Sequence, residues 1–106
     1  AMQDQHILKA YDRDLEAIQA HVLKMGGLVE DAIRQGAEAL SARDAEGAER
    51  VRAGDRAVDA LEQVVTEEVA RVMALRAPVG RDLRALLVAM RLATSLERVG
   101  DYAKNI

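Results

Sequence analysis

The 106-residue sequence contains no cysteine, phenylalanine or tryptophan, only two tyrosines and a single proline. The lack of cysteine excludes disulfides, thiolate metal sites and a cysteine nucleophile, and it is compatible with the cytosol. Without large aromatic residues, a core must be built from Ala, Leu, Val, Ile and Met, a composition that suits long helices packed side by side. Because proline is scarce and strand-like alternation is missing, we expect an all-α fold.

Several function classes are disfavoured by further absences. No apolar run approaches the roughly 18 residues of a membrane span, and no signal peptide is visible, so we expect no direct membrane insertion. Basic residues are interspersed with acidic ones at a formal net charge of −3, which argues against nucleic acid as a partner. No nucleophile–base pair, glycine-rich phosphate loop or zinc-binding helix motif is found, so we do not expect an enzyme.

Hydrophobic periodicity predicts a single domain of three long helices, at about 5–41, 44–76 and 79–106, in an up-down-up bundle. The stripe of the first helix comprises Tyr11, Leu15, Ile18, Val22, Met25, Val29, Ile33, Ala37 and Leu40. In the second helix a heptad seam is formed by Val51, Val58, Val65 and Val72, with Gly54, Leu61, Glu68 and Leu75 at the companion position. The breaks are predicted at the first turn, where Asp44 can cap the second helix, and at Pro78, which suits a first helical position.

The third helix carries two apolar stripes, so we expect it to be packed on two sides. One stripe comprises Leu83, Leu86, Leu87, Met90 and Ala93, and the other comprises Val88, Leu92, Leu96, Val99, Ala103 and Ile106. No helix-stop signal precedes the last residue, which predicts an incomplete third helix in the front part of a longer polypeptide. Leu92, Leu96 and Val99 would then stay exposed. We therefore expect a homo-oligomer, in which long helices joined by short loops can exchange between chains.

Acidic residues interrupt this apolar pattern. Glu97 occupies the next position of the first stripe, where a plain bundle would have leucine, and Asp101 follows one turn later. The second helix carries its own acidic row, Asp55, Asp59 and Glu62. If the second and third helices are antiparallel neighbours, these five carboxylates converge. Such a cluster suits a hard cation, namely Mg²⁺, Mn²⁺ or Ca²⁺, or iron as a carboxylate-bridged cluster.

A plainer interpretation of the same acids stays open. Arg52 and Arg56 lie three residues before Asp55 and Asp59, and Lys104 lies three residues after Asp101. Helix surfaces with interspersed acids and bases are ordinary, and spacings of three and four residues allow ion pairs. The acids would then be part of a solvated surface.

Four segments resemble motifs of the PhoU family of phosphate-signalling regulators. They are LERVGDYAKNI (residues 96–106), PVGRDLR (78–84), DRAVDALE (55–62) and MGGLVE (25–30). Their order and spacing agree with the family over essentially the whole chain. Ala77 and Gly80, in the loop before the third helix, depart from the family pattern.

The resemblance implies a fold of two repeated three-helix bundles, of which this chain covers the first and lacks the second. It also implies a cytoplasmic adaptor between the ATPase subunit of the phosphate ABC transporter and a sensor histidine kinase. Such an adaptor dampens phosphate-starvation signalling. Family members bind metals on paired acidic motifs, which match Asp55 and Asp59 with Glu97 and Asp101. The alternative is a metal-binding accessory protein of another phosphate carrier.

Overall fold

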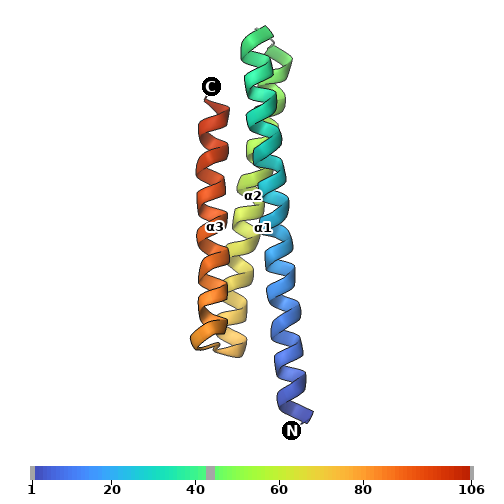
Figure 1. Ribbon diagram of the computed structural model, residues 1–106, viewed down its shortest axis with the longest axis vertical. Helices are drawn as coiled ribbons and strands as arrows, with labels where there is room; N and C mark the ends of the chain where they lie inside the picture. Colours follow the sequence, from blue (N-terminus) through green and yellow to red (C-terminus); the bar gives the residue numbers. More distant parts are fainter. Residues whose placement is uncertain (1, 43–44, 106) are drawn as a thin grey trace.

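The computed structural model describes residues 2–42 and 45–105, with side chains given from residue 9 onward except at residue 48. Over these residues the chain forms α1 (Met2–Ala42), α2 (Ala45–Arg76) and α3 (Gly80–Lys104). The helices run up, down and up in a rod of 62 × 18 × 17 Å, so α1 and α3 are parallel and α2 is antiparallel to both (Figure 1). The predicted all-α bundle is confirmed, whereas Asp44 and Ile106 lie outside the described residues.

The core lies between the three helices and consists of one long apolar cluster and a smaller one. All four valines of the α2 heptad seam are buried, as the spacing predicts. Val58, Val65 and Val72 share a cluster with the fully buried Ile18, Met25 and Leu86. Val51 packs in a second, smaller cluster with Ala32 and Ala103. Because valine and alanine dominate these clusters, the helices approach closely along most of their length.

The predicted stripe of α1 is wrong beyond Val29. Its last third was expected at Ile33, Ala37 and Leu40, but the buried residues are Ala32, Gly36 and Ala39. The buried positions thereby keep the alternating 3,4 spacing of a heptad, which holds one face toward its neighbours. Small residues also let α1 approach closely: a Cβ added at Gly36 would lie 3.4 Å from the Ala103 carbonyl oxygen.

The expectation that α3 is packed on two sides is also wrong. Its buried residues, Leu86, Ala89, Ala93, Gly100 and Ala103, all belong to a single face. Leu87, Val88, Leu92 and Val99 are exposed, and Leu96 is half-buried against the core. A triangular arrangement of three helices leaves every helix one outward face, so the second stripe of α3 has no neighbour within the described chain.

The loop between α2 and α3 uses two residues with positive φ. Ala77 (φ 42°) ends α2 in the left-handed region, and its N–H donates to the Met73 carbonyl at 3.1 Å. α3 begins at Gly80 (φ 58°), so Pro78 precedes the helix by two residues instead of occupying its first position.

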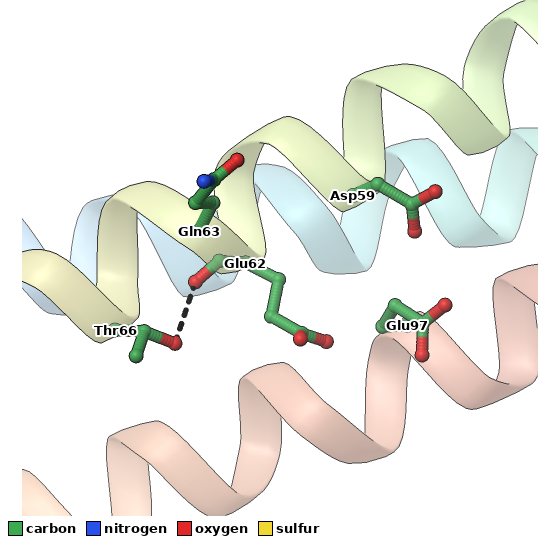
Figure 2. A pocket seen from close by; sticks show the side chains of 5 residues that line it. All are labelled: Asp59, Glu62, Gln63, Thr66 and Glu97. Atoms are coloured by element: carbon green, nitrogen blue, oxygen red, sulfur yellow. Dashed lines mark hydrogen bonds between the residues drawn. The ribbon is translucent and has the colours of Figure 1, made fainter.

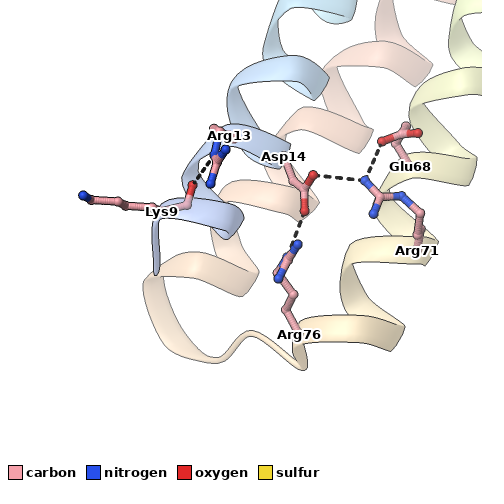
Figure 3. Close-up of polar contacts among 6 residues, drawn as sticks. All are labelled: Lys9, Arg13, Asp14, Glu68, Arg71 and Arg76. Atoms are coloured by element: carbon pink, nitrogen blue, oxygen red, sulfur yellow. Dashed lines mark hydrogen bonds and ion pairs between the residues drawn. The ribbon is translucent and has the colours of Figure 1, made fainter. Parts of the chain in front are cut away.

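Polar contacts tie α1 to this end of the bundle. Asp14 of α1 accepts hydrogen bonds from Arg76 at 2.8 Å and from Arg71 at 3.1 Å (Figure 3). The Tyr11 hydroxyl donates to the Asp82 carbonyl oxygen at the start of α3. Arg76 lowers the pKa of the Asp14 carboxyl, chiefly through its hydrogen bond. Among the described residues, no helix is both long and apolar enough to cross a membrane.

Candidate cation site between α2 and α3

Three of the five predicted carboxylates line one open cleft. Asp59 and Glu62 of α2 face it together with Glu97 of α3. Figure 2 shows the Glu62 and Glu97 side chains reaching into the space between the two helices. Gln63 and Thr66 complete a cleft of about 440 Å³. Sequence reasoning missed these two, although spacings of four and seven residues from Asp59 place them on the same helix face.

The α2 acids face α3 because the second row of inward-facing positions on α2 lies one residue later than predicted, at 55, 62 and 69 instead of 54, 61 and 68. Asp55 and Val69, a multiple of seven residues apart, are buried, and Glu62 between them is half-buried. The predicted companion residue Leu75 is instead 67 % exposed. Carboxylates therefore occupy positions where a plain bundle would place apolar residues.

The cleft is electrostatically unfavourable without a cation. Burial raises the pKa of the Glu97 carboxyl, and hydrogen bonding with Asp59 raises it further, as do the charges of Asp59, Glu62 and Asp101. The Glu62 Oε2 atom is buried and has no hydrogen-bond partner within the described chain. Thr66 does not supply one, because its hydroxyl donates to the backbone carbonyl of Glu62 at 2.9 Å. Among the residues that the structure describes, these groups have no positive partner.

The other two predicted acids are held by a lysine. Lys104 Nζ lies 3.3 Å from Asp55 Oδ2 and 3.1 Å from Asp101 Oδ1. Hydrogen bonds to these two acids raise the pKa of Lys104, and the bond to Asp101 has the larger effect. Asp55 is only 4 % exposed, and its second oxygen, Oδ1, has no hydrogen-bond partner among residues 2–42 and 45–105. At this end of the row the plainer interpretation, acids paired with bases, describes the structure.

Two arginines of α2 do not form the ion pairs that the plainer interpretation predicts. Arg52 and Arg56 both bind Glu49, at 2.9 Å and 3.4 Å, instead of the aspartates three residues later. In the structure, therefore, neither arginine supplies the cation for the cleft carboxylates.

The ligand atoms of the cleft are of the type that binds a hard cation, but the side chains that carry them are not close enough to share one ion. Three carboxylates and two neutral polar side chains are oxygen donors of the kind that Mg²⁺, Mn²⁺ and Ca²⁺ prefer. Within the described part of the chain, however, no three His, Asp or Glu side chains lie close enough together to hold one ion. The five predicted ligands are thus split into a cleft group of three and a lysine-bound pair.

Comparison with known proteins adds a family assignment to this geometry. The PhoU domain model matches residues 22–106, which is most of the chain. The chain belongs to the PhoU family. The predicted resemblance is thereby confirmed.

Relatives of this PhoU domain are named as accessory proteins of phosphate-specific transport systems. The PhoU homologue of Xylella fastidiosa (strain Temecula1) is 39 % identical over 95 % of the chain and 42 % of its own length. That of Zymomonas mobilis is 42 % identical over 95 % of the chain and 43 % of its own length. PhoU of Escherichia coli K12 is 35 % identical over 97 % and 43 %, respectively. The chain spans less than half the length of these relatives, and no solved structure matches it.

Proposed function

We propose that this PhoU domain acts in a cytoplasmic regulator of phosphate uptake and phosphate-starvation signalling. The regulator bridges the ATPase subunit of the phosphate ABC transporter and a sensor histidine kinase, lowers kinase signalling when phosphate is ample, and catalyses no reaction. The observation that carries the proposal is the 35–42 % identity to transport accessory proteins along nearly the whole chain. A rod 62 Å long is also suited to contact two partners at once.

Co-purification tests the adaptor role. The tagged full-length protein would be isolated from cells grown in high and in low phosphate, and the ATPase subunit and the kinase would be sought by immunoblotting. We expect both partners to be retained at high phosphate. Recovery of neither would contradict the proposal, and recovery of a different phosphate carrier would support the alternative accessory role.

The cleft formed by Asp59, Glu62 and Glu97 is proposed to bind a cation: Mg²⁺, Mn²⁺, Ca²⁺ or iron. Its support is the buried Glu62 oxygen without a hydrogen bond in the described chain, and the Glu97 pKa, which burial raises and the neighbouring carboxylates raise further. Because no three acidic side chains of the described chain lie close enough to hold one ion, binding would require rotamer changes of the two glutamates. Asp55 and Asp101 would join the site only where Lys104 releases them.

Metal addition to chelator-treated protein tests the site. An ion that binds only the folded state raises the unfolding free energy, by about 2.7 kcal/mol at a hundred times the dissociation constant. We expect this gain for the unmodified protein and for Glu67→Gln, an exposed control on α2, and its loss in Glu97→Gln. If elemental analysis finds no metal and no ion raises stability, the cation proposal is wrong, while the adaptor role is untouched.

A further inference from the structure

Beyond the cleft, the row of acids ends at a lysine that stands between two helices. Lys104 Nζ lies 3.3 Å from Asp55 Oδ2 of α2 and 3.1 Å from Asp101 Oδ1 of its own helix, α3. The Asp55 side chain is 5 % exposed, whereas that of Lys104 is 34 % and that of Asp101 is 51 % exposed. The ammonium group therefore connects a buried carboxylate with one that faces solvent.

Small residues of α3 let the end of this helix lie close to Asp55. Gly100 and Ala103 are buried, and a Cβ added at Gly100 would lie 3.8 Å from Asp55 Oδ1. Asp101 and Lys104 are three residues apart on α3, so they are neighbours on the helix surface and their ion pair helps to hold the lysine in place. An ammonium group is a compact charge with three donors. It can thus face two carboxylates at once, as a metal ion does.

The lysine satisfies these two acids only in part. Asp55 Oδ1 is buried and accepts no hydrogen bond within the part of the chain that the structure describes. One positive charge also faces two negative ones, whereas a divalent ion would balance both. Mg²⁺ is often held by one or two carboxylates together with several waters. The two acids therefore have the chemistry of cation ligands, and the lysine stands where the cation would be.

We infer that Lys104 acts as a built-in cation, which occupies the Asp55–Asp101 half of the acidic row in place of a metal ion. The family resemblance implies metal ligands at both acids, and the structure disagrees because an ammonium group already binds them. Metal is then confined to the cleft, and the end of α3 is attached to α2 without a metal ion. The inference rests on the proposed function only for the cleft ion, because Lys104 excludes metal from its own two acids whether or not the cleft is filled.

Replacement of the lysine by a neutral side chain of similar length tests the inference. Lys104→Met removes the charge and keeps an apolar stem, whereas Lys104→Arg keeps the charge. The probe is MnCl₂ added to chelator-treated chain, and the loss of the electron paramagnetic resonance signal of free Mn²⁺ counts the bound ions.

We expect Lys104→Met to bind one more Mn²⁺ per chain than the unmodified protein. Any Mn²⁺ that the unmodified chain takes up at the same place should bind at least about tenfold more weakly, because the ammonium group repels it. Lys104→Arg should bind as many ions as the unmodified chain. So should the control Lys24→Met, which removes an exposed lysine of α1.

Two double variants locate the additional ion. Asp55→Asn or Asp101→Asn, each combined with Lys104→Met, should abolish it. Thermal unfolding followed by circular dichroism supplies a second measurement. Without metal, Lys104→Met should melt below the unmodified chain, because Asp55 stays buried without a positive partner. Mn²⁺ should restore the melting temperature of this single variant and of neither double variant.

The two measurements can overturn the inference. An unchanged ion count in Lys104→Met would do so, as would an additional ion that survives both asparagine changes. A Lys104→Met chain that stays unfolded even with Mn²⁺ would also contradict it, whereas folding that depends on Mn²⁺ would support it. The cleft is judged separately, by the ion count of the unmodified chain and its decrease in Glu97→Gln. If the cleft binds nothing, the count should still rise from none to one when Lys104 is replaced by methionine.

Discussion

Replacing Glu97 by glutamine should stabilise the cation-free protein at neutral pH. The repulsion from Asp101, four residues away, costs about 0.2–0.5 kcal/mol on a helix surface. Asp101 is partly neutralised by Lys104, whereas Asp59 and Glu62 face Glu97 across the cleft and pair with no base in the described ranges. With a comparable cost for each of these, the neutral amide should gain about 1 kcal/mol in unfolding free energy. For a domain of this size, this raises the melting temperature by about 4–8 °C.

The pH dependence of this gain follows from the direction of the pKa shift. The pKa of Glu97 is raised above its ordinary value of 4.5, so between that value and the raised pKa the folded chain binds more protons than the unfolded chain. Stability then falls as the pH rises through this window. The glutamine variant and the unmodified protein should therefore differ little at pH 4 and most at pH 7.

Urea unfolding at both pH values, in the presence of a chelator, measures the difference. Addition of a bound cation should reverse the order, because the ion stabilises only the protein that keeps the carboxylate. Glu67→Gln serves as the control and should change stability little at either pH. A glutamine variant that is less stable than the unmodified protein at pH 7 without metal would refute the reasoning, since Glu97 would then have a favourable partner.

Further predictions concern the bundle itself. Gly27→Ala should add about 1 kcal/mol, because Gly27 lies inside α1 and an added Cβ meets no atom within 4 Å. Gly80→Ala should cost about 1–2 kcal/mol, because its φ of 58° is strained for alanine. Urea unfolding measures both changes. Equal effects on the unfolding free energy would contradict the placement of Gly27 inside a helix and of Gly80 at a positive φ. Asp14→Asn should cost about 1 kcal/mol at pH 7. Since the pKa of Asp14 is lowered from 3.8, this loss should vanish as the pH falls through the lowered pKa, as followed by thermal unfolding. Lys104→Ala should destabilise the fold by leaving Asp55 buried without its cation, and Asp55→Ala should relieve much of that loss in the double variant.

Much of the architecture follows from local pattern. The heptad valines Val51, Val58, Val65 and Val72 predict one buried face of α2, and Pro78 marks the second break. These signals depend on neighbours a turn or two away, so they can be read without knowing the partner helices. The family motifs at residues 55–62 and 96–106 are equally local, and they indicated a regulatory accessory protein of phosphate transport.

Tertiary packing decided which candidate residues face the core and which meet one another. Ile33 and Leu40 of α1 are more hydrophobic than Ala32 and Gly36, yet the small pair is buried, because only small residues allow α2 and α3 to come close. Likewise, whether Lys104 binds Asp55 depends on where α3 lies against α2.

For this chain, then, the sequence by itself determined the helix count, the order of the helices and the acidic residues set into an apolar stripe. Only the tertiary structure divided those acids into a group of three that lines the cleft and a pair bound to Lys104. The physical reason is that periodicity defines a face of one helix, whereas the charge balance at a site depends on distances between side chains of different helices.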